Sequence, residues 1–593
     1  MEQYVDYNDR LAVPDKLFTP LHGVELTGGL FRQVFANNIE FTLKCLNMDR
    51  MRYWFDVKQG NEPKAKRYSG HFEDNLKGQT ASQFLMSAGN TLRWVEHAEL
   101  RAGMNQVLDF IEAAAEKDGF LMPIDQTQFA FREYPHYVRI WLNYGLIAAG
   151  LGGSDRALPL LRRWQDWFNR CPDLPVIKYL ELAFQGVVAS TSVYFTPVGQ
   201  PEDMAVNRQY YEETWRLAQF IGHERDAVHI RRQHGAEPHA HGSELEGFEG
   251  YLDMYRFFGA PYLLNAVKGC WDLYVQDWQH VGGGIVMCEM SPHAQPGCRY
   301  FYTTNIYNEL CTSAFWLQLN QRLHRLFPDE ERYVFEMEQS IYNIAIANQR
   351  DTTDIRSYAW IDLMKKRPIR PNHCCSGVGT RIFASLPEYL FTMNRDTLSC
   401  DLFAACRLHW QTAGQIIDVE EETLFPYDGQ VDYRFNMAKP QYFTLRVRVP
   451  RYAGQTDIFL NGGRIAVGKP GTYAVIQREW QNGDHLSFTL AMTFEAHLYD
   501  GVDQVKGFTR YALTYGPLLM ALVGDRNHTY GTILENCQGP EFIRRLEPTA
   551  TPLHFRYRGT ADYDVVPYFE ICDEYFTCYP MFRDNELLGY TPG

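Results

Sequence analysis

Residues Phe443 to Pro450 read Phe-Thr-Leu-Arg-Val-Arg-Val-Pro, and this stretch marks a change in the character of the chain. Its apolar residues alternate with Thr and Arg, as in a β-strand with one buried face, and the run stops at proline. A hairpin signal, Asn461-Gly462-Gly463, follows soon afterwards. Short strands at this spacing predict one or two antiparallel β-sandwiches after Asn394.

Before Asn394 the apolar residues recur with helical spacing, at i, i+3, i+4 and i+7, and Gly and Pro punctuate the pattern. The expected helices, with weaker segments near 31–46, 79–88 and 177–190, are Thr91–Ala115, His136–Gly150, Arg156–Asn169, Asn207–Ile221, Glu244–Phe258, Ala260–Gln276, Thr304–Leu326, Glu331–Asn348 and Gly377–Phe391. Close to a dozen sequential helices without a coiled-coil heptad fit an (α/α)6 toroid, although periodicity alone also allows another all-α array.

The length of 593 residues exceeds what one hydrophobic core holds, which is roughly 250–300 residues. We therefore expect a multidomain α+β protein. Its parts are an N-terminal segment over 1–29 that packs on the β-sandwich, an (α/α)6 catalytic domain over 30–393, a β-sandwich over 394–500 and a second β-rich domain over 501–593.

The composition excludes several classes of partner. The net charge of −15, from 57 Lys+Arg and 72 Asp+Glu, repels phosphate backbones and argues against nucleic acid. Nothing approaches the roughly 20 uninterrupted apolar residues of a membrane helix, and the first residues lack the pattern of a secretory signal, so we expect a cytoplasmic protein without a membrane partner. Aromatic residues make up 15% of the chain and suit either sugar stacking or a large core. The 13 cysteines are then expected to be reduced.

An adjacent pair of cysteines, Cys374 and Cys375, is the strongest chemical signal. It follows Arg370-Pro371-Asn372-His373 and comes immediately before an expected helix. Neighbouring cysteines rarely bridge each other, and thiols at a helix N-terminus face the positive end of the helix dipole, which favours thiolate. Thiolate binds zinc and attacks carbon. The alternative is that both are half-buried core cysteines.

Glu309 and Cys311 open another expected helix. A Glu-x-Cys segment can bring both side chains to one ion if the backbone there is not yet regular helix. Together with Cys374 and Cys375 they would make a zinc site of one oxygen and three sulfur ligands. The spacing matches no zinc-finger pattern, and Glu309 taken alone reads as a helix N-terminal carboxylate.

Two further segments carry groups of catalytic type. Glu289 follows Gly282-Gly283-Gly284 in a loop between two helices, where catalytic groups often lie. His239 and His241 precede the helix at Glu244; they could bind a metal, but helix-entry histidines more often hydrogen-bond a polar substrate.

On these residues the chain resembles the β-L-arabinofuranosidase family, glycoside hydrolase family 127. The likeness spans nearly the whole sequence, and further matching stretches are Gly29-Leu30-Phe31, Asp49-Arg50-Met51, Leu76-Lys77-Gly78-Gln79, Gly250-Tyr251-Leu252 and Tyr515-Gly516-Pro517-Leu518. The resemblance implies an (α/α)6 barrel with β-sandwiches, a zinc ion and a small oligosaccharide or glycoside as substrate. Self-association into a homo-oligomer is left open.

The resemblance also implies a role for each residue. Cys374 would be nucleophile and zinc ligand, with Cys375, Cys311 and Glu309 as the other ligands. Glu289 best matches the acid/base, with Glu244, Glu246 and Glu249 as rivals. Arg381 matches a family arginine, and together with His239 and His241 it would bind the substrate.

Some features depart from the family pattern. Ser376-Gly377-Val378 stands where many relatives have Pro-Pro-Asn, the Glu289 loop is longer than usual, and Leu310 lies inside the Glu-x-Cys motif. The leading expectation is therefore a retaining exo-acting β-L-arabinofuranosidase. The alternatives are a glycosidase of the same scaffold for another rare terminal sugar, deoxy or acidic, and a non-catalytic carbohydrate-binding protein stabilised by zinc.

Overall fold

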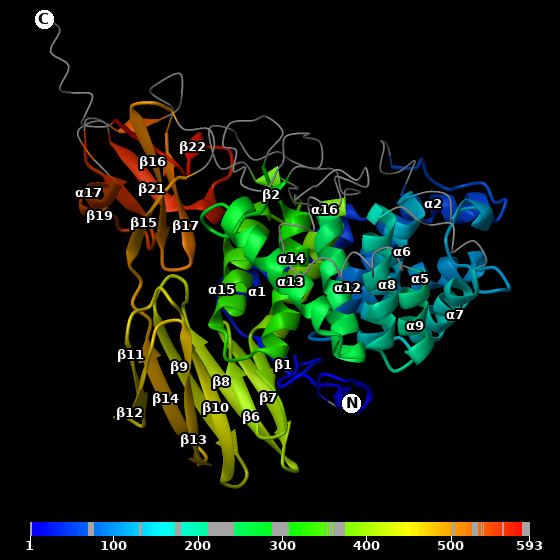
Figure 1. Ribbon diagram of the computed structural model, residues 1–593, viewed down its shortest axis with the longest axis horizontal. Coiled ribbons are helices and arrows are strands. Elements are labelled where there is room, and N and C mark those ends of the chain that lie inside the picture. Colours follow the sequence, from blue (N-terminus) through cyan, green and yellow to red (C-terminus); the bar gives the residue numbers. More distant parts are fainter. Residues whose placement is uncertain are drawn as a thin grey trace, which may run out of the picture.

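The computed structural model describes residues 3–68, 76–129, 133–171, 180–210, 242–287, 307–349, 351–353, 355, 358–359, 374–500, 505–524, 532–534, 537, 539–559 and 562–583. It has a helical N-terminal part and two β domains beside it (Figure 1). Among the described residues, no helix has both the length and the apolar character needed to cross a membrane.

Six inner helices form a ring in the described part of the chain. They are α4 (Gln79–Leu92), α6 (Glu133–Leu151), α8 (Leu180–Tyr194), α12 (Gly242–Phe258), α14 (Leu310–Leu326) and α16 (Cys374–Ala384). Each packs against the next in this order, and α16 packs against α4, so the contacts return to their start. The fold class expected from the sequence, helical first and β afterwards, is confirmed.

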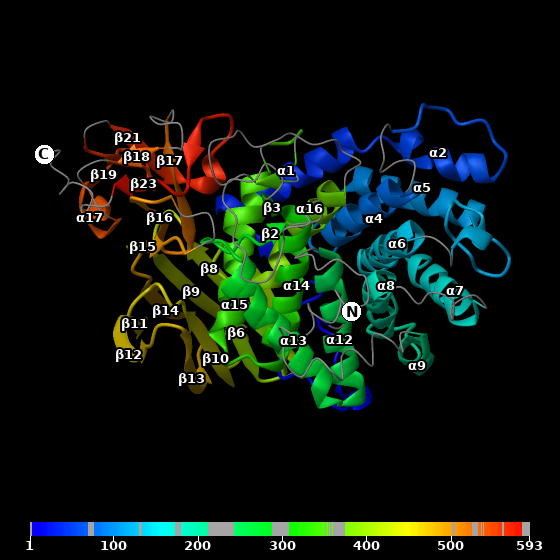
Figure 2. The ribbon, with the colours of Figure 1, turned by 45° about the horizontal axis from the view of Figure 1, so that its top comes forward.

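Outer helices cover the ring and alternate with the inner helices along the chain. They are α1 (Gly29–Cys45), α5 (Ala98–Ala114), α7 (Ala157–Arg170), α9 (Pro201–Tyr210), α13 (Pro261–Leu273) and α15 (Glu331–Gln339). Each packs on an inner helix that is next to it in sequence, and α1 also packs on α16. An additional helix, α2 (Met48–Lys58), packs on α5 (Figure 2). Because an outer helix returns the chain each time, the inner helices share one direction and their N-termini meet at one end of the ring.

Three expected helices have different limits in the structure. The helix predicted over Thr91–Ala115 is two helices, α4 and α5, because the chain leaves α4 at Arg93, whose side chain binds the carbonyl oxygens of Pro20 and Leu21. The helix predicted from Gly377 begins at Cys374 and ends at Ala384. The helix predicted from Thr304 begins at Leu310 and follows strand β3. Most of the helix expected over 207–221 lies outside the described residues.

The first β domain is a sandwich of two sheets. The larger sheet runs β1-β7-β8-β9-β14-β11-β12 and the smaller runs β13-β10-β6-β5. The strands are β1 (Val24–Leu26), β5 (Phe391–Met393), β6 (Thr397–Cys400), β7 (Cys406–Thr412), β8 (Gln415–Thr423), β9 (Gln430–Met437), β10 (Gln441–Val449), β11 (Thr456–Leu460), β12 (Gly463–Gly468), β13 (Thr472–Trp480) and β14 (Asp484–Thr489). Pairing is antiparallel except between β6 and β10, and β1 brings the N-terminal segment into the larger sheet.

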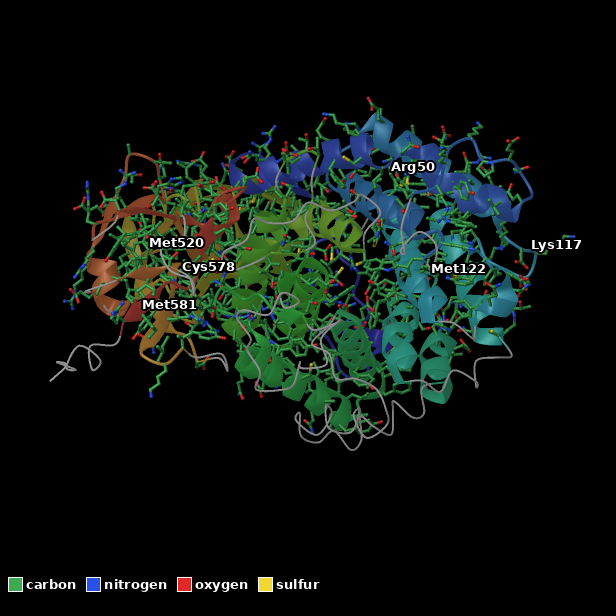
Figure 3. All side chains as sticks on the ribbon, turned by 90° about the horizontal axis from the view of Figure 1, so that it is seen from above. Arg50, Lys117, Met122, Met520, Cys578 and Met581 are labelled. Atoms are coloured by element: carbon green, nitrogen blue, oxygen red, sulfur yellow. The ribbon has the colours of Figure 1, made fainter. Side chains whose placement is uncertain are left out.

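The second β domain is one sheet in the order β18-β23-β16-β17-β21-β20-β19, with β15 on β16 and β22 on β17. Its elements are β15 (Phe494–Leu498), β16 (Phe508–Tyr515), β17 (Leu518–Val523), β18 (Ile533–Leu534), α17 (Gly539–Arg544), β19 (Leu546–Pro548), β20 (Phe555–Tyr557), β21 (Tyr563–Pro567), β22 (Phe576–Thr577) and β23 (Met581–Arg583). Seen from above, Met520, Cys578 and Met581 of this domain lie at one end of the molecule, and Arg50, Lys117 and Met122 lie at the other (Figure 3).

The N-terminal segment also closes the end of the ring opposite the inner-helix N-termini. The carboxylate of Asp15 is buried and forms ion pairs with Arg256 of α12, at 2.5 Å, and with Arg325 of α14. Both arginines lie in the last turns of their helices. The inner helices begin at the other end of the ring. The cysteines and the glutamate that the sequence analysis singled out as a metal site lie at that end.

Candidate active and metal site

Glu309, Cys311, Cys374 and Cys375 come together at the N-termini of α14 and α16. One ligand atom of each lies within 4.8 Å of the others, and all four side chains are buried. The sulfur atoms of Cys311 and Cys375 are 3.1 Å apart, and those of Cys374 and Cys375 are 3.9 Å apart. The Cys375 sulfur lies 3.4 Å from Oε1 of Glu309. The four residues singled out as a metal site are therefore neighbours in space.

The local backbone explains how Glu309 and Cys311 reach the same point. A small sheet, β2 (Val286–Met287), β3 (Tyr307–Glu309) and β4 (Tyr358–Ala359), leads into α14, and Glu309 pairs with Tyr358. Glu309 is the N-cap residue of α14 and has extended backbone angles, φ −92° and ψ 137°. The hydroxyl of Thr312 donates to Oε2 of Glu309 at 2.9 Å and holds the carboxylate in place. Glu309 therefore lies outside the regular helix, whereas Cys311 lies in the first turn of α14.

The donor set fits a zinc ion. Burial raises the pKa of the Cys311 thiol well above its usual value, and the neighbouring Cys374 and Cys375 raise it further, so the cluster does not favour several thiolates by itself. A divalent cation reverses this balance by stabilising each anion. One carboxylate and three thiolates match the tetrahedral preference of Zn²⁺ for oxygen, nitrogen and sulfur ligands. The first turn of α16 adds the positive end of its dipole at Cys374 and Cys375.

Arg381 lies two turns after Cys374 on α16 and faces the interior of the ring. Its guanidinium carbon is 3.9 Å from the centre of the Tyr144 ring, which belongs to α6. Helix α4 separates α6 from α16 around the ring, so this contact takes place inside it. No described residue forms a hydrogen bond with the buried Nη1 of Arg381.

Three of the predicted site residues have no described position. His239 and His241 belong to the segment 211–241, and Glu289 belongs to the segment 288–306; both segments lie outside the described residues. The segment 211–241 ends directly before inner helix α12. The segment 288–306 ends before β3, which leads into inner helix α14. Their roles therefore stay predictions.

Two further residues lie near the cluster: Tyr137, which the sequence reasoning did not name, and Glu246, which it named only as a rival for the acid/base. Tyr137, in the first turns of α6, has a pKa raised well above the usual value by burial and then by Cys374 and Cys311. Glu246, in the first turns of α12, has a pKa raised by burial and then by Glu249 and Glu309, against the effect of Arg381.

A signal for Glu246 was present in the sequence. Charged residues recur along α12 at Glu246, Glu249, Asp253 and Arg256, which places them on one face of the helix. All four are buried in the structure. Charged groups are almost never fully buried without a partner or a function, so a charged stripe on a helix of a helical ring indicates the inward face.

The comparisons with known proteins agree with this arrangement. The family model of the β-L-arabinofuranosidase GH127 catalytic domain matches residues 23–388, and the model of the GH127 middle domain matches residues 397–492. These matches define the protein as a glycoside hydrolase, an enzyme whose substrate is a carbohydrate. More particularly, the chain belongs to the β-L-arabinofuranosidase family GH127.

Solved structures show the same fold. The structure of Ara127N-Se, a GH127 β-L-arabinofuranosidase from Geobacillus stearothermophilus T6, matches with a TM-score of 0.75 and 16% identity over 94% of this chain and 100% of that chain. The GH127 β-arabinofuranosidase BT3674 matches with a TM-score of 0.73 and 16% identity over 98% of this chain and 97% of that chain. A third structure, described as a glycoside hydrolase, has a TM-score of 0.72 and 14% identity over 98% of this chain and 100% of that chain. No curated protein sequence matches the chain.

Proposed function

We propose that this chain is a retaining exo-glycoside hydrolase that releases a terminal β-L-arabinofuranose with Cys374 as the nucleophile and Zn²⁺ as the cofactor. The observation that carries the proposal is the buried cluster of Glu309, Cys311, Cys374 and Cys375 at the shared end of two inner helices, with its ligand atoms within 4.8 Å. The family of the chain supports the sugar class, since its models are those of β-L-arabinofuranosidases.

The chemistry is a double displacement with a thiolate in place of the usual carboxylate nucleophile. The sulfur of Cys374 attacks the anomeric carbon, an S–C bond forms, the glycosidic C–O bond breaks, and Glu289 donates a proton to the departing oxygen. Water then attacks the same carbon, Glu289 accepts its proton, and the C–S bond breaks to restore the thiolate. When bound, zinc keeps the cysteines deprotonated near neutral pH.

Cys374 has the least enclosed side chain of the three cysteines, with 7% of its surface exposed, against 1% for Cys311 and 0% for Cys375. A nucleophile has to meet its substrate, whereas a pure ligand does not. This difference supports Cys374 as the reacting sulfur and supports Cys311 and Cys375 as residues that only hold the metal.

A second candidate is a glycosidase of the same scaffold that acts on an acidic or deoxy terminal sugar. The unbonded, buried Nη1 of Arg381 favours the acidic case, because a guanidinium suits a carboxylate. Turnover of a panel of 4-nitrophenyl pentofuranosides, uronides and deoxyhexosides, with the released sugar identified, separates the two candidates.

The first prediction separates nucleophile from ligand. Cys374→Ser should abolish turnover and keep part of the zinc, because Glu309, Cys311 and Cys375 remain, whereas Cys375→Ser should lose zinc first and activity with it. Zinc content and rates are measured on the same preparations. A haloacetamide built on the cognate sugar should label Cys374 in the wild type. A fully active Cys374→Ser variant, or label spread over many cysteines, contradicts the thiolate mechanism.

The second prediction concerns the acid/base. Glu289→Gln should slow hydrolysis of substrates with poor leaving groups far more than that of 4-nitrophenyl glycosides, since a good leaving group needs little protonation. Rates with an alkyl and a 4-nitrophenyl glycoside of the same sugar give the comparison. Full activity of the variant on both substrates moves the role to one of the rivals, Glu244, Glu246 or Glu249.

A further inference from the structure

Polar side chains from helices that are not neighbours in the ring meet on its axis. Arg381 of α16 stacks on Tyr144 of α6, although α4 lies between these helices around the ring. Glu246 of α12 comes from the opposite side of the ring, and its carboxyl group contributes to raising the pKa of Tyr137 of α6. Polar side chains from several helices therefore extend into the interior of the ring below the cysteine cluster.

Glu246 is a buried carboxyl group of this interior that has neither a hydrogen-bond partner nor an ion-pair partner among the described residues. Its side chain is fully buried, with 0% exposed, and neither carboxyl oxygen has a hydrogen-bond partner among the described residues. Leaving a buried polar group unpaired costs free energy, so such a group calls for a specific explanation, such as a ligand or a catalytic role.

Glu249, one turn along the same helix, also has no hydrogen-bond partner for either carboxyl oxygen among the described residues, but it has a charged neighbour. It forms an ion pair with Arg322 at 2.6 Å, and Arg322 is also paired with Asp253 at 3.4 Å. Glu246 has no such ion pair in the described part of the chain, although the positive charge of Arg381 acts on it. An acceptor on α12 and a donor, Nη1 of Arg381, thus face the same interior without bonding to each other.

We propose that Glu246 is a substrate-contacting residue that binds two neighbouring hydroxyl groups of the terminal sugar, while Arg381 donates to another oxygen of that sugar. The inference rests on the proposed function, because it places the sugar ring between these side chains and the Cys374 sulfur. A carboxyl group can bind a vicinal diol through both oxygens, and Arg381 supplies the donor that the sugar oxygen needs.

The protonation of Glu246 suits this task. Burial and the neighbouring Glu249 raise its pKa well above the usual value, although Arg381 acts in the opposite direction, and the raised pKa favours the neutral acid. A neutral carboxyl donates one hydrogen bond and accepts another, which matches hydroxyl groups that both donate and accept.

The test compares Glu246→Gln and Glu246→Leu with the wild type on a hydroxylated substrate and its 2-deoxy and 3-deoxy analogues, all as 4-nitrophenyl glycosides. A site built around a hydroxyl rejects the deoxy analogue, so we expect the wild type to prefer the full substrate by about 10²-fold or more in kcat/KM. Glu246→Leu should lose most of this preference, and zinc content should not change. If Glu246 had a merely structural role, its replacement would leave the preference for the hydroxylated substrate unchanged. This preference is therefore the informative readout.

Glu336→Gln is the matched control. Glu336 is also a buried glutamate on a helix with a pKa raised by burial, but it lies on outer helix α15 and accepts hydrogen bonds from Gln279 and Trp316. This variant should keep the wild-type preference for the hydroxylated substrate. If Glu246→Gln does not fold, as judged by circular dichroism, Glu246→Asp replaces it, since it keeps the carboxyl group and shortens its reach.

Calorimetry with L-arabinose on the Cys374→Ser protein distinguishes failure of this inference from failure of the proposed function. If the wild type hydrolyses the glycosides but Glu246→Leu keeps the full preference, the inference is overturned and the proposed function stands. If the wild type hydrolyses none of the glycosides, the proposed function fails; weaker L-arabinose binding in Glu246→Gln then supports the inference, and equal or absent binding overturns it.

Discussion

Glu249 is a single residue whose environment gives the protein a pH response. Burial raises its pKa from 4.5 to about 7, against the lowering effect of Arg322 and Arg381. Because the folded state holds this proton more tightly than the unfolded state, the contribution of Glu249 to stability is full below pH 4.5 and is lost as the pH rises towards 7. We predict that Glu249→Gln flattens the fall in stability over this range, measured by urea unfolding followed by circular dichroism.

The exposed Glu62 provides the control for this prediction. Glu62→Gln makes the same chemical change at an exposed position and is measured alongside Glu249→Gln. The difference between wild type and Glu249→Gln is the informative quantity, since Glu336, Glu338 and Glu421 also have raised pKa values and contribute equally to both proteins. Parallel curves for the two proteins would show that Glu249 does not titrate in this range.

At the residue scale, the sequence singled out the four residues of the buried cluster but not all of their neighbours. Cys374 and Cys375 were recognisable because two adjacent thiols before a helix are chemically unusual, and Glu309 and Cys311 because they open a helix. Glu246 was named only as a rival for the acid/base, and Tyr137 was not named. Their position depends on which face of α12 and α6 turns inward, and that is decided by the closure of the ring.

At the scale of elements, glycines let α4 and α6 pack closely. A Cβ atom on Gly89 of α4 would lie 2.3 Å from the carbonyl carbon of Ala148 of α6, and one on Gly152 would lie 2.6 Å from the carbonyl oxygen of Gly89. We predict that Gly89→Ala destabilises the protein by up to about 2 kcal/mol, because an overpacking cost of about 1–3 kcal/mol against rigid backbone is offset only in part by the roughly 1 kcal/mol gained in helix propensity.

Gly463→Ala is the control in the β-sandwich. A Cβ atom there would meet only the carbonyl oxygen of Leu460, at an ordinary 3.6 Å. Urea midpoints of both variants are compared with that of the wild type. A Gly89→Ala protein as stable as the wild type would show that α4 and α6 can separate without cost.

Helix periodicity predicted most of the ring's helices, yet it did not predict where several of them end. The apolar pattern continues through Arg93, but the structure breaks the helix there because the side chain of Arg93 binds the N-terminal segment and Glu388, at 2.6 Å. Such ends are set by contacts between distant parts of the chain. Local propensity cannot report them.

At the scale of the whole molecule, the smaller sheet of the sandwich docks on the helical ring. The alternation of β10 predicted that Thr444, Arg446 and Arg448 face away from the sandwich core, but Arg448 is fully buried. Its guanidinium forms ion pairs with Glu331 and Glu338 of α15, at 2.8 and 2.9 Å. The sequence showed the two faces of the strand and could not show that a helix covers the second one.

The second β domain docks through a different group. Asn343, in the segment after α15, donates to the carbonyl oxygens of Gly282 and Pro517 and accepts from the backbone N–H of Leu519 at 2.8 Å. Both β domains therefore meet the ring at or just after α15. This helix ends the outer layer of the ring just before the chain reaches α16 and the cysteine pair.

The docking of the sandwich gives the last prediction. Arg448→Met removes the shared cation and leaves the carboxylates of Glu331 and Glu338 buried without it, which typically costs about 3–5 kcal/mol. Arg451, at 3.2 Å from Glu331, remains but is half exposed and reaches only one of the two carboxylates. We expect a lower melting temperature and faster proteolysis between the ring and the sandwich. Arg464→Met, which breaks the exposed pair with Asp457, should change stability by less than about 1 kcal/mol. Equal effects of the two substitutions would show that the buried network does not hold the domains together.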